Sequence, residues 1–123
     1  MTSGYGHLGQ LDPGYRKEVA LADTPEKLRA ISFRPDDPMQ YNYIGLYKLS
    51  KAMLNQVTCI AAKEFADDLV VYSVCPGWVQ TRQGGEDAAR TIPQGGKIIL
   101  WAINDAPAAK SGCFIKDRLC FDL

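Results

Sequence analysis

The chain has 123 residues and a mass of 13.6 kDa, which allows one domain with a modest core and excludes two. Hydrophobic residues make up 46% of the sequence and charged residues 23%, so the composition is globular rather than disordered or collagen-like. Lys and Arg number 14, and Asp and Glu also number 14, so no positive excess favours binding to a nucleic-acid backbone. We therefore expect no nucleic-acid partner.

The four cysteines, Cys59, Cys75, Cys113 and Cys120, contain no Cys-x-x-Cys pair, and the chain has one histidine, His7. This spacing does not provide a structural zinc site, so we expect no metal and interpret the cysteines as small buried side chains. The sequence has no 18-residue apolar run, and its N-terminus lacks a basic segment followed by an apolar stretch. We therefore expect no membrane association and a cytoplasmic location, where thiols stay reduced.

Glycine and proline are frequent in the first 40 residues, so only short helices are expected there. The best candidate has Thr24 as its N-cap and Pro25 as its first helical residue, and it ends before Pro35.

The segment Gly4–Gly9 matches the G-x-G-x-x-G string of dinucleotide-binding turns. That string binds a pyrophosphate only between a strand and a helix, because the helix N-terminus carries the phosphate charge. Only three residues precede Gly4, and Pro13-Gly14 follows soon after Gly9. We therefore interpret this segment as a loop.

Between residues 43 and 65, apolar side chains recur in a wide stripe that predicts a long, heavily packed helix. The run from Leu69 to Val74 predicts a short strand, buried on both faces of a parallel sheet. A helix that leads directly into a buried strand indicates an α/β architecture.

Pro76-Gly77 predicts a turn after this strand. Thr91 and Gln94 match a capping box, which predicts a second helix from Pro93 to Asn104. A final short strand over residues 113–115 is expected to pair with the earlier strand.

Tyr47 and Lys51 are spaced i and i+4 on the first predicted helix, so they lie on one face of it. A free tyrosine has a pKa of about 10, and an ammonium group a few ångströms away lowers the pKa of a phenol by roughly 1–3 units. Such a phenol is a better proton donor at neutral pH. Helices also carry such pairs as an amphipathic tyrosine beside a surface lysine, so the spacing alone leaves both interpretations open.

Several motifs follow one another as in the second half of a short-chain dehydrogenase/reductase (SDR), and they resemble its carbonyl-reductase-like branch in particular. Tyr-x-x-x-Lys followed by Pro-Gly is more specific than either motif alone. The motifs are Tyr47-x-x-Ser50-Lys51-Ala52, Cys75-Pro76-Gly77-Trp78-Val79-Gln80-Thr81, Gly84-Gly85, Thr91-x-Pro93 and Ser111-Gly112-Cys113-Phe114-Ile115-Lys116-Asp117-Arg118.

The resemblance implies hydride transfer between NADP or NAD and a carbonyl or alcohol carbon. Tyr47 would be the acid/base that protonates the carbonyl oxygen, and Lys51 would assist it and bind the ribose hydroxyls of the cofactor. Tyr47 would contact the cofactor as well. Ser3, which precedes the first glycine of the amino-terminal loop, would hold the carbonyl oxygen.

The resemblance also assigns a cofactor-binding role to the segment after the predicted buried strand. Pro76 and Gly77 would form the turn at the carboxyl end of that strand, where open α/β sheets bind their ligands. Val79 would offer backbone groups, and Thr81 its hydroxyl, to the nicotinamide carboxamide. Both NADP and NAD stay open, because the family reads the ribose 2′-position with a residue of its first half.

We therefore expect residues 1–123 to form a single partial SDR domain, the carboxyl-terminal half of a Rossmann-type, doubly wound parallel sheet. The amino-terminal nucleotide-binding half is expected to be absent, so the isolated chain should be inactive. Residues 9–40 resemble an insertion that covers the substrate, and residues 41–123 would carry the catalytic helix, the strands and the C-terminal region.

Two functions stay open. One is that the chain is part of an oxidoreductase acting on a small carbonyl or alcohol substrate, and the other is that it is a short, non-catalytic relative that binds a full-length subunit. Association through the helix at residues 43–65, also as a homo-oligomer, fits either function.

Overall fold

The computed structural model describes residues 1–32 and 43–123. The described chain contains short 3-10 turns, α-helices and short β-strands. In chain order these are η1 (Gly4–Gly6), η2 (Leu8–Gln10), α1 (Pro13–Leu21), α2 (Pro25–Arg29), α3 (Tyr43–Glu64), β1 (Ser73–Cys75), α4 (Ile92–Asn104), η4 (Ala108–Lys110), β2 (Phe114–Lys116) and β3 (Leu119–Phe121).

The described strands form a mixed sheet in the order β1-β2-β3. β1 pairs with β2 in parallel, with Val74 opposite Ile115, and this confirms the predicted pairing of the two strands. β3 is antiparallel to β2, so the expectation of a wholly parallel sheet is wrong at this edge. The reason is the two-residue connection Asp117-Arg118, whose φ angles of 53° and 63° form the left-handed turn that a tight hairpin requires.

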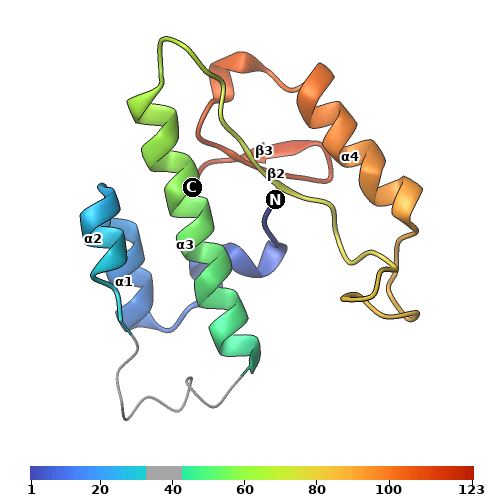
Figure 1. Cartoon of the computed structure of the whole chain (residues 1–123), viewed down its shortest axis with the longest axis horizontal. Coiled ribbons are helices and arrows are strands. Elements are labelled where there is room, and N and C mark those ends of the chain that lie inside the picture. The colour runs from blue at the N-terminus through green and yellow to red at the C-terminus, as the bar shows by residue number, and fades with distance from the viewer. Residues whose placement is uncertain (33–42) are drawn as a thin grey trace.

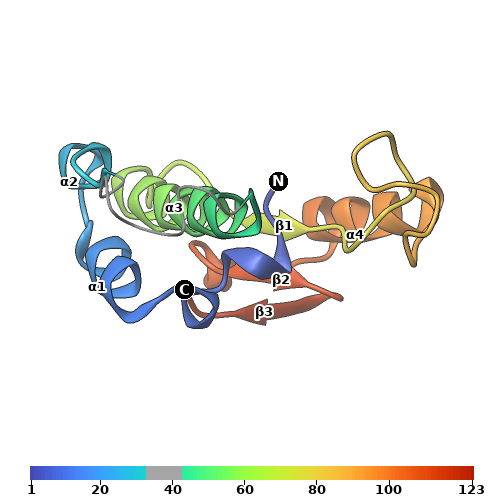
Figure 2. The ribbon, with the colours of Figure 1, turned by 90° about the horizontal axis from the view of Figure 1, so that it is seen from below.

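The sheet lies between α3 on one face and α4 on the other, with α1 and α2 outside α3 (Figure 1, Figure 2). On the α4 face, Ile98 and Ala102 pack with Cys113 and Ile115 in one hydrophobic cluster. On the α3 face, the Ser73 hydroxyl donates a hydrogen bond of 2.9 Å to Asn55 Oδ1, and both residues are buried. The observed architecture is therefore layered α/β.

The predicted helices are confirmed where local signals specify them. α3 is the helix predicted over residues 43–65, and α4 begins after the predicted capping box of Thr91 and Gln94. α2 begins at Pro25, with the Thr24 hydroxyl accepting from the Lys27 amide as N-cap.

Helix α1 was not predicted, although Asp12-Pro13 is a helix-start signal of the same kind. The Asp12 carboxylate accepts from the Gly14 amide at 2.8 Å, which caps the helix. Tyr15 and Val19 of α1 are fully buried and pack with Leu49 of α3 in another cluster.

The predicted strand over residues 69–74 is wrong in its first part and in its burial. The strand begins only at Ser73, and the side chains of Leu69 and Val70 are 56% and 51% exposed. The Leu69 amide donates back to Phe65 O in the turn that ends α3. In the register of β1 with β2, a longer β1 would pair with residues 110–113, which form the end of the 3-10 turn η4 and the turn after it and offer no extended partner.

The Gly4–Gly9 string forms η1 and η2, with no α-helix directly after Gly9, in agreement with the loop interpretation. The insertion expected over residues 9–40 is described as far as Ser32, and its remainder lies outside the described residues. Its described helices, α1 and α2, lie against α3. Among the residues that the structure describes, no helix is both long and apolar enough to cross a membrane.

Candidate active site

An open cleft of about 940 Å³ lies where the amino-terminal segment, α3, α4 and the turn after β1 meet. Every site residue predicted from the sequence lines this cleft. These residues are Ser3, Tyr47, Lys51, Pro76, Gly77, Val79 and Thr81. The structure thus brings them together, whereas the role of each stays a prediction.

The amino-terminal segment reaches the cleft because it lies beside β1. The Thr2 amide donates to Val74 O at 2.8 Å, whereas the neighbouring Ser73 amide donates to Cys113 O in the segment leading into β2. Since successive residues of a strand point their backbone groups to opposite edges, Thr2 lies on the edge of β1 away from β2. Ser3 therefore emerges at the same end of the sheet as the Pro76-Gly77 turn.

Close packing of η1 on α3 then fixes Ser3 relative to the helix. A β-carbon at Gly6 would lie 2.8 Å from the Lys51 backbone carbonyl, so only glycine allows this approach. Buried Asn55 donates from Nδ2 to Gly6 O at 3.0 Å. Ser3 Oγ accepts a hydrogen bond from the Tyr5 amide at 3.2 Å, which leaves its own hydrogen able to donate to a ligand.

Tyr47 and Lys51 lie side by side, as their spacing predicts. Lys51 Nζ is 5.5 Å from the centroid of the Tyr47 ring, within the range of a cation–π contact. The Tyr47 ring is also flanked by Tyr5, edge-on at 6.4 Å, and by Tyr43, stacked at 6.5 Å. The Tyr47 ring is therefore packed against two other rings and the Lys51 ammonium group.

The Pro76-Gly77 turn is held by Arg90, which the sequence did not reveal as a site residue. Gly77 has a φ of 84°, a conformation that favours glycine, and a β-carbon there would collide with the Arg90 guanidinium. Arg90 Nη1 donates to Pro76 O at 3.0 Å, and Nη2 forms an ion pair with Asp117 of the β2–β3 hairpin. Arg90 therefore connects the turn after β1 to the end of β2.

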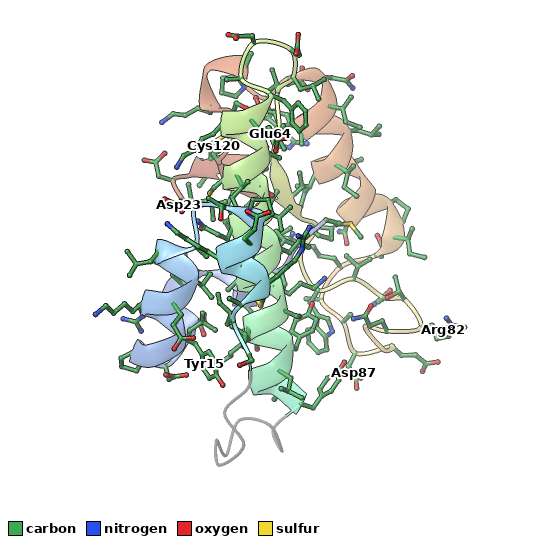
Figure 3. All side chains as sticks on the ribbon, turned by 60° about the vertical axis from the view of Figure 1, so that its left-hand side comes forward. Tyr15, Asp23, Glu64, Arg82, Asp87 and Cys120 are labelled. Carbon is green, nitrogen blue, oxygen red and sulfur yellow. The ribbon has the colours of Figure 1, made fainter. Side chains whose placement is uncertain are left out.

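The loop after this turn closes on itself. Thr81 Oγ1 accepts from the Gly84 amide at 3.0 Å and donates to Val79 O at 3.3 Å. The Thr81 hydroxyl and the Val79 carbonyl, which are predicted to meet the nicotinamide carboxamide, are thus hydrogen-bonded to each other. A ligand that formed a hydrogen bond with Thr81 would replace one of these contacts. Figure 3 shows Arg82 extending outward from this loop, away from the helices of the amino-terminal region.

Comparisons of the sequence with family models and with curated proteins give no match. Chains of solved structures do match this chain, and two of them are the following. Salutaridine reductase from Papaver somniferum has a TM-score of 0.76 and 22% identity over 94% of this chain and 43% of that chain. Carbonyl reductase Sniffer of D. melanogaster has a TM-score of 0.54 and 28% identity over 62% of this chain and 32% of that chain.

Both structures are members of the SDR family, in agreement with the resemblance noted from the sequence. The chain spans less than half the length of either one. Its fold is therefore that of part of an SDR, with a small mixed sheet in the part described here.

Proposed function

We propose that this chain carries the carbonyl-reducing site of an NAD(P)-dependent oxidoreductase, with Tyr47 as the acid/base. The observation that supports this function is the convergence of Ser3, Tyr47 and Lys51 on one cleft from segments more than 40 residues apart. An amphipathic Tyr-Lys pair on a solvated helix face would not need a serine in the same cleft.

The described residues fit a nicotinamide cofactor in their chemistry. The cleft volume lies within the range of small-molecule sites, roughly 300–1,000 Å³. Its described lining contains the lysines Lys51 and Lys116 and no carboxylate, which suits an anionic dinucleotide. When bound, the cofactor would supply the hydride.

The roles of the side chains follow from their positions. Ser3 Oγ donates to the carbonyl oxygen and holds it toward Tyr47. The Tyr47 hydroxyl gives its proton to that oxygen as the carbonyl carbon is reduced, and it takes a proton back in alcohol oxidation. The Lys51 ammonium stabilises the resulting phenolate and donates to the ribose hydroxyls. Gly77 leaves room for the guanidinium group of Arg90, which holds the turn after β1.

The test uses this chain with a nucleotide-binding half of the same fold supplied as an amino-terminal fusion, after circular dichroism has shown a cooperative melt. The rate of NADPH oxidation at 340 nm is then measured with a small aldehyde. Tyr47→Phe retains the ring contacts and removes the proton donor, so we expect the rate to fall by about 10² or more. The affinity for NADPH should change by less than about twofold.

Two controls distinguish a catalytic face from general damage. Tyr72→Phe also removes a phenol, whose hydroxyl donates to Pro107 O and is not part of the cleft lining. Lys48→Ala removes the preceding lysine of α3. Both variants should retain the rate within about twofold, whereas Lys51→Ala should lower both the rate and the affinity for NADPH. A Tyr47→Phe variant that keeps most of its rate would show that the proposed acid is wrong.

The second candidate function is binding to another subunit through α3. Apolar side chains on this helix are exposed, among them Tyr43 at 74%, Ile44 at 55% and Val57 at 46%. Exposed apolar side chains on one helix are typical of an interaction surface. Sedimentation of the chain tests this function, because Val57→Lys should shift any dimer toward monomer, while Lys63→Glu at the end of the same helix should not.

A further inference from the structure

Lys116, the last residue of β2, lines the cleft, although it is not among the site residues predicted from the sequence. Its side chain lies across Gly4: a β-carbon at Gly4 would be 3.6 Å from Lys116 Nζ and 3.9 Å from Cδ. The lysine therefore does not extend straight into solvent. It follows the backbone next to Ser3, where glycine leaves room for it.

The strand alternation explains this direction. Ile115 packs on the α4 side of the sheet with Ile98 and Ala102, so the next residue must face the opposite side. Lys116 is paired with Cys75, the last residue of β1, and Pro76-Gly77 follows directly. The ammonium group of this exposed lysine thus lies at the carboxyl end of the parallel strands, on the face that carries η1 and α3.

The charge of Lys116 is not balanced within the part of the chain that the structure describes. Its neighbour Asp117 is paired with Arg90 instead, and the described lining of the cleft includes no Asp or Glu. A cation beside a cleft without a carboxylate favours an anionic ligand. Its place next to Gly4 and Ser3 puts it on the side where the carbonyl oxygen would be held.

We propose that Lys116 binds a carboxylate of the substrate, so that the cleft takes carbonyl compounds that carry a carboxylate group. This inference rests on the proposed function for the side of the cleft that holds the carbonyl. It assigns to Lys116 a specificity-determining contact, separate from Lys51, which faces the tyrosine and the ribose.

The test measures binding rather than turnover, so its outcome does not depend on hydride transfer. The probes are levulinate, a keto acid, and its uncharged methyl ester, at constant ionic strength. Trp78 lines the cleft, so its emission reports binding once the other tryptophan is removed by Trp101→Phe. In this background we expect levulinate to bind at least fivefold more tightly than the ester.

Lys116→Gln should raise the Kd of levulinate about fivefold, or about 1 kcal/mol, and leave that of the ester within twofold. Lys116→Arg should retain the preference. Lys97→Gln, which removes an exposed lysine from α4, should leave both Kd values within twofold and so controls for the overall field of the protein.

Equal affinity for the acid and the ester, or no binding of the acid at 20 mM, would overturn the inference. The inference would also be overturned if Lys116→Gln raised the Kd of ADP, a probe for cofactor phosphates, more than it raised the Kd of levulinate. A reductase that acts on neutral aldehydes with Lys116 dispensable would sink this inference alone, whereas Lys116-dependent levulinate binding without any reductase rate would sink the proposed function alone.

Discussion

Gly95 and Gly96 are adjacent in α4 but have different surroundings, which makes them a matched pair of substitution sites. A β-carbon at Gly96 would meet nothing within 4 Å. At Gly95 the same atom would lie 2.7 Å from Val79 Cγ2 and 3.6 Å from Pro76 Cβ, in the turn that lines the cleft. The two alanine variants therefore share the change in helix propensity and differ in packing.

The propensity change stabilises both variants. Alanine is more favourable than glycine in a helix interior by about 0.8–1.0 kcal/mol, so Gly96→Ala should raise the free energy of unfolding by up to that amount. Gly95→Ala must also displace Val79, and overpacking of this kind costs about 1–3 kcal/mol. Val79 is β-branched, which restricts rotation about its χ1 angle, and its Cγ1 would lie at 3.4 Å as well.

We therefore expect Gly95→Ala to be less stable than Gly96→Ala by about 1–3 kcal/mol. Urea unfolding followed by far-UV circular dichroism measures both free energies against the unsubstituted chain. If both variants are stabilised equally, the close contact between α4 and the turn after β1 does not exist, and the shape of the cleft at Val79 is wrong.

Other predictions concern a helix cap, a thiol and a carboxyl group. Thr91→Ala removes the N-cap of α4 and should lower the free energy of unfolding by about 1 kcal/mol in the same assay, while Thr91→Ser should not. Burial is the larger cause, and the contact with the Cys120 thiol the smaller, that raises the pKa of Cys113 to about 12. Iodoacetamide at pH 8 should therefore label Cys113 on the order of 10³-fold more slowly in the native chain than in urea. Equal labelling rates would refute this prediction. A hydrogen bond of 2.6 Å from Lys27 lowers the pKa of the Asp23 carboxyl group below 3.8. The pair therefore stabilises the fold at pH values above the pKa of Asp23 in the unfolded chain, and this effect is lost as the pH falls through the pKa of Asp23 in the folded chain. NMR titration of Lys27→Ala should find the midpoint of Asp23 rising toward 3.8.

The sequence by itself specified the elements that depend on neighbouring residues. The starts of α2 and α4 follow from Thr24 and Thr91, because a side-chain cap bonds to amides only two or three residues away. The common face of Tyr47 and Lys51 follows from helix geometry alone. For the same reason α1 was also predictable from its start at Asp12-Pro13, and the frequent glycines and prolines around it masked that signal.

Contacts between distant residues were decided only by the tertiary structure. The length of β1 depends on whether its partner segment is extended. The apolar run that includes Leu69 cannot show that this segment, residues 110–113, is the end of the 3-10 turn η4 and the turn after it. Ser3 lines the same cleft as Tyr47 because Gly6 packs against the Lys51 backbone, a contact between residues 45 positions apart that no local pattern encodes. Lys116 enters the cleft for a similar reason, since pairing with β1 fixes the face of the strand on which it lies. Local sequence thus set the helices and their faces, whereas packing across the sheet decided which side chains share the cleft.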